Sequence, residues 1–542
     1  MKALPVVGTS ALATGGCCSA DQAAPSVYPP NRKALAERFR ATLQGGEASP
    51  EAIELSLRTE AFLDRCILHA FEYRGERHLL DPVTGMLFSL EESSHRFALA
   101  LAAELRGTDL ARAVDEAGLD HAESLLLDLE RMEAAEGMFR RSAMSLGKMI
   151  DRAIESYLAH HPRKMMLCIA QTCNLRCVYC YAIEGNYHDE GRLMSLATAQ
   201  QSIRYLAKRA GRRRNLTITL FGGEPLINFS MMRELIPWAK AWARTIGKRV
   251  HFCITTNGTL LTDEIIDFLI HHKMSIMISL DGPKEVQDLT RPNSSGKGSF
   301  DAAAPRIKKL LERHPHPEII KVRATMTHQS HDTVRLSQFF ESFGFKRIGL
   351  GANVGYSFYK GPFDMTAVDK AEVYSYTEEF LDHGGLDAIR AYRETTFDPV
   401  RPSLLAIQGD MDRRGPSIKM PCGVGRNDQG IDVDGVIYPC HRYVGMKAYV
   451  MGNVFDGVSL DSLRKFYEGI LGAYKHCGDC WANRWCSGHC PNYLSDPTGK
   501  SFGPDDTACD ALRAGLQRNI ALHSKLGSEG IDWRKVEGAR PV

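Results

Sequence analysis

Three closely spaced cysteines carry the strongest chemical signal in this sequence. Cys173, Cys177 and Cys180 follow the spacing C-x3-C-x2-C. Three thiolates on one short loop can bind three irons of a 4Fe–4S cube, whereas most iron–sulfur proteins supply a cysteine for every iron. The fourth iron would stay open to a small molecule, so the loop predicts a cluster that does chemistry. A zinc site is the alternative, but zinc sites usually have four ligands in paired spacings, and no second pair lies nearby.

A second group of cysteines lies in the C-terminal part of the chain. Its members are Cys422, Cys440, Cys477, Cys480, Cys486, Cys490 and Cys509. Their dense, asymmetric spacing argues against a zinc ribbon. The chain has 15 cysteines, and these spacings fit metal clusters better than disulfides. Oxygen-sensitive clusters favour a reducing cytoplasm. Cys168 and Cys253 lie in apolar segments, where a buried cysteine behaves as a small hydrophobic side chain.

The elements that must position the first loop begin near residue 164. Runs of apolar and β-branched residues alternate with helical segments and glycine-rich turns, which is typical of a parallel sheet buried on both faces. The predicted strands are Met165–Ala170, Leu216–Phe221, His251–Thr256, Ser275–Leu280, Ile320–Met326 and Arg347–Leu350. Six such units are fewer than a closed barrel needs. We therefore expect an α/β fold with a partial, open (β/α)6 barrel.

Polar motifs follow the predicted strands, and β/α barrels place functional residues just past the carboxyl ends of their strands. The cysteine loop follows the first strand, and Gly222-Gly223-Glu224-Pro225 follows the second. Two glycines there would let the backbone approach a ligand closely. Thr256-Asn257-Gly258 follows the third strand, and Ser279-Leu280-Asp281 ends the fourth. Arg323 on the fifth strand could bind a carboxylate, whose geometry matches a guanidinium fork.

The cysteine loop, with Tyr179 before its last cysteine, and the Gly-Gly-Glu-Pro element one unit later resemble the radical S-adenosylmethionine (SAM) superfamily. The resemblance implies a TIM-like partial barrel over residues 160–355. It implies that Cys173, Cys177 and Cys180 bind a catalytic 4Fe–4S cluster, whose open iron chelates SAM and cleaves it to a 5′-deoxyadenosyl radical. The implied SAM contacts are Tyr179, Gly222, Gly223, Glu224, Pro225, Thr256, Asn257, Ser279, Asp281 and Arg323.

The seven-cysteine pattern resembles the SPASM extension of radical SAM enzymes, which implies two auxiliary 4Fe–4S clusters within residues 421–515 and three clusters in all. On this resemblance one set of cysteines binds the distal cluster: Cys477, Cys480, Cys486 and Cys509. The proximal cluster would use Cys422, Cys440 and Cys490. Some members have an eighth cysteine earlier, and residues 412–417 have none. The proximal cluster would then keep an open iron, which suits a substrate thiolate, or use an unidentified ligand.

The run from Gly435 to Val454 resembles maturases that form thioether cross-links from peptide cysteines. The resemblance implies an oxidoreductase that modifies a Cys-containing peptide or small protein with a leader, supplied with electrons by a reductant such as flavodoxin or ferredoxin. A carbon–carbon cyclophane former shares most features. An anaerobic sulfatase-maturating enzyme, which makes formylglycine, would have an acidic residue where this chain has His441. An iron–sulfur electron carrier is the non-enzyme alternative, against which the open three-cysteine loop argues.

Composition places few limits on partners. Apolar residues make up 44% and charged residues 24% of the 542-residue chain, as in ordinary soluble domains. The net charge of +2 gives no bulk electrostatic case for nucleic acid or a membrane. No run approaches the ~20 apolar residues of a spanning helix, so we expect a cytoplasmic protein. Residues 1–30 are rich in Ala, Gly, Ser and Pro, which favours a disordered leader segment over a signal peptide.

Residues 31–150 predict a small α+β domain. We expect an amphipathic helix within 31–70, a hairpin over Phe71–Leu90 with a turn at Asp81–Gly85, and a helix over Glu91–Arg106 capped by Ser93 or Ser94. Residues 107–160 predict further helices. This pattern resembles the winged-helix-like domains that bind leader peptides, where a strand edge could capture a peptide by strand addition; a plain structural cap is the alternative. Residues 356–420 predict a connector, and 516–542 a C-terminal tail.

Overall fold

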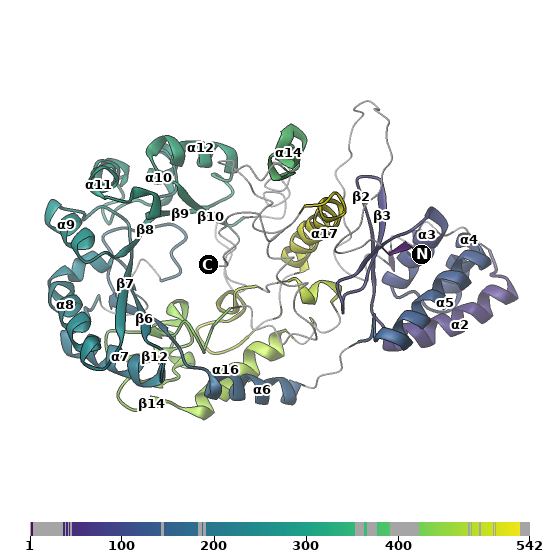
Figure 1. The fold of residues 1–542 in the computed structure, drawn as a ribbon, viewed down its shortest axis with the longest axis horizontal. Helices are drawn as coiled ribbons and strands as arrows, with labels where there is room; N and C mark the ends of the chain where they lie inside the picture. Colours follow the sequence, from purple (N-terminus) through teal and green to yellow (C-terminus); the bar gives the residue numbers. More distant parts are fainter. Residues whose placement is uncertain are drawn as a thin grey trace.

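The computed structural model describes residues 2–3, 36–37, 40–41, 43, 46–141, 146–182, 187, 191–352, 363–365, 377–390, 422–474, 477, 480–486, 489–501, 503 and 506–531. A ten-stranded sheet with helices on its outer side lies beside a smaller four-stranded sheet packed on helices (Figure 1). Helix α17 (Asp506–Ser528) lies between them (Figure 1). Most of the predicted connector, 356–420, lies outside the described residues. Within it, Leu381–Gly385 forms a kink with non-helical backbone angles at His383 and Gly384, and α14 (Leu386–Arg390) is helical.

Six parallel strands form the first part of the large sheet, in the order β10-β9-β8-β7-β6-β5. Their bounds are β5 (Lys164–Ala170), β6 (Asn215–Gly222), β7 (Arg249–Thr256), β8 (Ser275–Ser279), β9 (Lys321–Met326) and β10 (Arg347–Ala352). All six predicted strands are therefore confirmed. Helices connect successive strands, so their carboxyl ends meet at one edge of the sheet.

Burial alternates along the inner strands of this sheet. In β6, Leu216, Ile218 and Leu220 are buried, whereas Thr217 and Thr219 are partly exposed. The expectation of burial on both faces is wrong here, because an open barrel covers only its outer face with helices. The covering helices are α7 (Leu196–Arg209), α8 (Phe229–Thr245), α9 (Asp263–His271), α10 (Lys284–Thr290), α11 (Phe300–Arg313) and α12 (Thr333–Phe343) (Figure 1).

The segment after Cys422 extends the sheet beyond β5. Strand β11 (Gly430–Ile431) pairs in parallel with β5, placing Gly430 opposite Met166. Three antiparallel strands continue it: β12 (Val436–Tyr438), β13 (Gly452–Asn453) and β14 (Gly457–Val458). Helix α16 (Leu460–Ala473) packs on α6 (Leu146–Ala159). This extension attaches the segment that carries Cys440 to the parallel sheet beside β5.

The small sheet has the order β1-β4-β3-β2 and is antiparallel throughout. Its strands are β1 (Lys2–Ala3), β2 (His69–Tyr73), β3 (Glu76–Leu80) and β4 (Leu87–Ser89). It packs on α2 (Pro50–Arg65), α3 (Glu92–Ala102), α4 (Gly107–Ala117) and α5 (Leu119–Glu136). The expected helices between 107 and 160 are present as α4, α5 and α6.

Three expectations for this region need correction. Phe71–Leu90 lies in three strands rather than one hairpin, because Arg74 and Gly75, both with positive φ, form an additional tight turn. Helix α2 covers only part of the predicted range 31–70. It begins after Ser49, whose side chain caps it, and it ends at Arg65, before β2 begins at His69. Glu91, not Ser93 or Ser94, is the N-cap of α3. Lys2 and Ala3 of the expected disordered leader pair with β4, and the rest of that leader lies outside the described residues.

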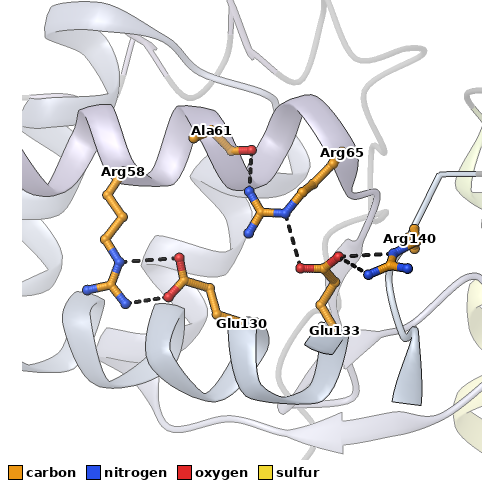
Figure 2. Close-up of polar contacts among 6 residues, drawn as sticks. All are labelled: Arg58, Ala61, Arg65, Glu130, Glu133 and Arg140. Atoms are coloured by element: carbon orange, nitrogen blue, oxygen red, sulfur yellow. Dashed lines mark hydrogen bonds and ion pairs between the residues drawn. The ribbon is translucent and has the colours of Figure 1, made fainter. Parts of the chain in front are cut away.

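Arginine–glutamate pairs join α2 to α5 (Figure 2). Arg58 contacts Glu130, while Glu133 accepts from Arg65 at 3.1 Å and from Arg140 at 2.8 Å (Figure 2). The hydrogen bond from Arg140, with that from Arg65, holds the pKa of Glu133 below its ordinary value. Exposed ion pairs stabilise a fold only slightly, so they orient the two helices, and the buried apolar side chains between them supply most of the stability.

Asp81 joins the turn after β3 to the end of α5, and it is fully buried. Its carboxylate accepts hydrogen bonds from the backbone N–H groups of Val83, Thr84 and Phe139 at 2.9–3.1 Å. Each buried donor left unsatisfied costs about 1–3 kcal/mol, so we expect Asp81→Ala to lower local stability by about 2–4 kcal/mol. Hydrogen exchange at residues 81–87 and 137–141 would report it. Asp120→Ala, at an exposed position, is the control. Equal protection from hydrogen exchange in both variants would contradict the proposed role of Asp81 in joining the two segments.

The small sheet docks on the C-terminal part of the chain. The His69 ring stacks on Trp481, with centroids 3.8 Å apart and an interplanar angle of 3°. Phe71, Leu80 and Leu87 form one apolar cluster with Trp485 and α17. The N-terminal domain therefore rests directly on the segment that carries Cys480 and Cys486.

Candidate active site

A cavity of about 330 Å³ lies at the carboxyl ends of the parallel strands. The first cysteine loop forms one wall, and strand ends form another. The predicted residues that line it are Cys173, Cys177, Tyr179, Cys180, Gly222, Gly223, Thr256, Asn257, Ser279 and Arg323. Glu224, Pro225 and Asp281 are buried and do not line it. The structure thus brings ten of the predicted residues together around one space and places three behind its wall.

The cysteine loop is held by its backbone and by Asn257. Arg176 N–H donates to Pro292 O at 2.7 Å, and Val178 N–H donates to Thr290 O at 3.0 Å. The sulfur of Cys173 accepts from Leu175 N–H at 3.4 Å and lies 3.9 Å from Asn257 Nδ2. Such donors favour a thiolate at Cys173.

Burial opposes ionisation of these thiols. Desolvation raises the pKa of Cys173 to about 11 and that of Cys177 to about 12. Both are therefore protonated at neutral pH in the free protein, and binding of a metal must release their protons.

The Gly-Gly-Glu-Pro element, residues 222–225, holds together the strand ends that form one wall of the cavity. A Cβ on Gly222, whose φ is +138°, would lie 2.3 Å from Ala170 O, so only glycine allows β5 and β6 to approach here. Glu224 accepts from Leu226 N–H at 3.0 Å, from the Thr256 hydroxyl at 2.8 Å and from Asn257 N–H at 2.8 Å. Its carboxylate thereby ties the end of β6 to the end of β7.

Asn257 continues this network to the cysteine loop. Its Nδ2 donates to Asn174 Oδ1 at 2.9 Å, and Asn174 Nδ2 donates to the Thr259 hydroxyl at 2.7 Å. Because Asn257 also lines the cavity, one side chain connects the loop, the strand end and the space between them.

Asp281 organises the far side of the loop. Its carboxylate accepts from the hydroxyls of Tyr179 and Thr290 and, at 3.0 Å, from Thr325 N–H. Arg291 donates to the Tyr179 hydroxyl at 2.7 Å and lines the cavity. Burial raises the pKa of Tyr179 well above its ordinary value, so this tyrosine stays a neutral donor. Arg291 was not among the predicted site residues; its place after the Asp288-Leu289-Thr290 run was the available signal.

Three cavity residues come from the second cysteine group and were not predicted: His441, Arg442 and Tyr493. The Arg442 guanidinium lies between two rings, 4.9 Å from the centroid of Tyr181 and 4.8 Å from that of Tyr493. It also donates to the Tyr493 hydroxyl at 2.8 Å. Their closeness in sequence to Cys440 and Cys490 could have indicated them, since those cysteines were expected to lie near the first cluster.

The His441 imidazole is packed edge to face against Phe221 at 4.8 Å and Tyr181 at 5.7 Å. Its Nδ1 has no hydrogen-bond partner within the described residues. Burial, and secondarily Arg442, lowers the pKa of His441 to about 3. The cavity therefore contains a neutral imidazole held mainly by aromatic contacts.

Arg323 extends from β9 into the cavity and is more than a third exposed there. Within the described part of the chain it makes no hydrogen bond or ion pair. Burial of part of the side chain and repulsion from Arg442 lower its pKa. A guanidinium in this position is suited to an anion such as a carboxylate.

The second-group thiols influence one another in two sets. The pKa of Cys440 is raised to about 12 by burial and then by Cys490 and Cys422. The pKa of Cys509 is raised to about 12 by burial, with further contributions from Cys477, Cys480 and Cys486. The expected proximal and distal ligand sets stay a prediction. Among the described residues, no three His, Cys, Asp or Glu side chains lie close enough to bind one metal ion. The ligands of an iron–sulfur cluster each bind a different iron, so they need not meet at one point.

Comparison with known proteins identifies the domain. Residues 167–334 match the Radical SAM superfamily. The chain is 23% identical over 413 residues to the radical SAM cyclopropyl synthase TigE of Paramaledivibacter caminithermalis, covering 70% of this chain and 81% of that protein. It is 25% identical over 376 residues to a cysteine-type anaerobic sulfatase-maturating enzyme of Clostridium novyi, covering 65% of this chain and 93% of that enzyme.

A solved structure shares the fold. The native enzyme anSMEcpe with bound AdoMet superposes with a TM-score of 0.53 at 18% identity, covering 68% of this chain and 100% of that chain. The same enzyme with AdoMet and the Cp18Cys peptide gives a TM-score of 0.51. The chain is thus an α/β enzyme with a mostly parallel central sheet. It carries a radical SAM domain, which implies a 4Fe–4S cluster and SAM.

The residues present fit this cofactor pair. Three thiols face one cavity, one of them with N–H donors at its sulfur, and a guanidinium suited to a carboxylate faces the same space. Among the described residues, none of the helices is long and apolar enough to cross a membrane.

Proposed function

We propose that this enzyme modifies a peptide or small protein by joining a cysteine sulfur to a carbon atom, forming a thioether. One observation carries the proposal: the cavity lined by the three-cysteine loop is also lined by His441, Arg442 and Tyr493. These residues adjoin or closely follow Cys440 and Cys490. Substrate atoms in this space would therefore lie between the first cluster site and the proximal auxiliary site.

The predicted site residues receive roles in this proposal. Cys173, Cys177 and Cys180 hold the first 4Fe–4S cluster, which together with SAM supplies a 5′-deoxyadenosyl radical. Arg323 binds the SAM carboxylate, while Gly222, Gly223, Thr256, Asn257 and Ser279 border SAM. Glu224, Pro225, Asp281 and Tyr179 set the shape of the wall through the network described above. Glu224 was expected to contact SAM; in this proposal it acts mainly through the wall, because its buried carboxylate already accepts three hydrogen bonds from the protein.

Residues 421–515 serve as the SPASM domain in this proposal, with two auxiliary clusters and three clusters per chain. When the bond forms, a substrate carbon loses a hydrogen atom and the cysteine sulfur loses a proton. One electron then leaves toward the second cysteine group, and a reductant such as flavodoxin or ferredoxin supplies the electron that starts the reaction.

The products distinguish the alternatives. The anaerobically reconstituted enzyme is mixed with SAM, dithionite and the short peptides encoded beside its gene. Thioether formation predicts 5′-deoxyadenosine and a peptide that has lost hydrogen and no longer reacts with iodoacetamide. A carbon–carbon product would lose hydrogen but keep its thiol, and formylglycine would react with a hydrazide. Absence of 5′-deoxyadenosine under all conditions would contradict the enzyme assignment.

His441 gives a test within the cavity. His441 follows Cys440 at the position where an anaerobic sulfatase-maturating enzyme would have an acidic residue. Its presence therefore favours the peptide cross-linking hypothesis over formylglycine formation. We expect His441→Ala to form 5′-deoxyadenosine at a normal rate while cross-linked peptide falls at least tenfold, because a substrate contact is lost and SAM contacts remain. His441→Phe keeps the aromatic packing, and a fully active Phe variant would limit the residue to a packing role.

Residues 31–150 bind the substrate leader in this proposal. Lys2–Ala3 pairs with the outer edge of β4, so this edge can hold an added strand, and a leader would bind there by displacing that pair. Leu90 N–H donates to Arg77 O on β3, and N–H groups alternate in direction along a strand. The Ser89 N–H therefore points outward. We expect Ser89→Pro to weaken binding of a fluorescent leader at least fivefold, with Ser89→Ala unchanged; equal binding would favour the structural-cap alternative.

A further inference from the structure

Arg323 occupies space that a side chain on the neighbouring strand would fill. It lies on β9, opposite Gly349 of β10. A Cβ built on Gly351 would lie 2.0 Å from Arg323 Nη2 and 2.6 Å from its Cζ. A Cβ on Gly349 would meet Arg323 Cδ at 3.5 Å and Nη1 at 3.6 Å, which are both ordinary contacts. The guanidinium therefore lies near both glycines, but only at position 351 does it occupy the space that a Cβ would fill.

Backbone conformation does not require glycine at position 351. The φ of Gly351 lies outside the left-handed region that favours glycine. It lies on β10, the edge strand of the sheet, and glycine is less favourable than alanine in a strand. The observed reason for glycine is the absence of a Cβ beneath the guanidinium.

Little else in the described part of the chain fixes this guanidinium. No hydrogen bond or ion pair is formed by Arg323 there, and Arg442 repels it. A flexible arginine without a polar partner would sample several rotamers. The space that Gly351 leaves without a Cβ is where the guanidinium lies, and both residues line the cavity.

We propose that Gly351 is a positioning residue, which leaves the space that aims the Arg323 guanidinium at a carboxylate in the cavity. The inference rests on the proposed role of Arg323 as a carboxylate partner. The carboxylate belongs either to SAM or to the peptide substrate. With a Cβ at position 351, the arginine must move its far end, which is inexpensive for folding but displaces the charge from its binding position.

Gly351→Ala and the matched control Gly349→Ala test this. Binding of S-adenosylhomocysteine, which has the SAM carboxylate, is compared by calorimetry with binding of methylthioadenosine, which lacks it. We expect Gly351→Ala to weaken S-adenosylhomocysteine roughly ten- to hundredfold, the range of a charge-assisted hydrogen bond. Methylthioadenosine binding, thermal unfolding and the Gly349→Ala variant should all resemble wild type. If only the KM for peptide rises in Gly351→Ala, the carboxylate is that of the substrate.

Arg323→Ala separates the two levels of the proposal. If it changes neither ligand binding nor peptide KM, Arg323 is not a carboxylate partner, and the inference falls with that role. If Arg323→Ala weakens binding but Gly351→Ala does not, or if Gly349→Ala weakens it equally, Arg323 keeps its role and Gly351 is not what positions it.

Discussion

Replacing Cys173, Cys177 and Cys180 together by alanine is expected to abolish 5′-deoxyadenosine formation. The three thiols face one cavity with Arg323 and Asn257, and no other described cysteines share that space. The variant should retain about 8 of about 12 irons per chain, because two proposed clusters remain. Iron analysis and chromatography of the reaction with SAM and dithionite would measure both quantities.

A buried cysteine outside the cavity supplies the control. Cys168 lies on β5, is fully buried and is not a cavity residue. Cys168→Ala removes only a small apolar group and should keep both the iron content and 5′-deoxyadenosine formation. Normal 5′-deoxyadenosine formation by the triple variant would refute the assignment of the loop.

The sequence allowed the strands and the cysteine loop to be predicted because their signals are local. β-branched runs such as Leu216–Phe221 and glycine-rich turns such as Gly222–Gly223 depend on neighbouring residues. The turn at Asp81–Gly85 after β3 was also predicted, whereas the Arg74-Gly75 turn was not. Arginine is not a typical turn residue, so its positive φ of 50° had no signal in the sequence.

Roles that depend on distant residues could not be read from local patterns. Glu224 is saturated by donors that include residues 32 and 33 positions away. Arg442 reaches the cavity only because β11 adds to the edge of the sheet beside β5. Such contacts arise from the topology, and no spacing rule in the sequence encodes them.

The same topology links the cysteine groups to the N-terminal domain. Trp481 follows Cys480 and stacks on His69, while Arg442 follows Cys440 and faces the cavity. The second group therefore contacts a proposed leader-binding domain on one side and the reaction space on the other.

Replacing Cys422, Cys440 and Cys490 by alanine is expected to have the opposite effect to the first triple variant. SAM cleavage should continue, because none of these residues belongs to the first loop, but cross-linked peptide should fall at least a hundredfold. We expect this loss because these cysteines are the proposed ligands of the proximal cluster, and His441 and Arg442, which follow Cys440, line the cavity. Iron should again be about 8 per chain. Unchanged cross-linking would rule out a role for the proximal cluster.

The last prediction concerns binding of a substrate thiolate to the proposed proximal cluster. The proposed proximal set has three cysteines, so one iron is free for a soft sulfur ligand. A peptide whose acceptor cysteine is changed to serine should still bind but should not be cross-linked. In the variant that lacks Cys173, Cys177 and Cys180, only auxiliary clusters remain, and the wild-type peptide should shift their paramagnetic resonance spectrum while the serine peptide should not. An unchanged spectrum at saturating wild-type peptide would mean that a protein ligand completes the cluster, and would favour a carbon–carbon product.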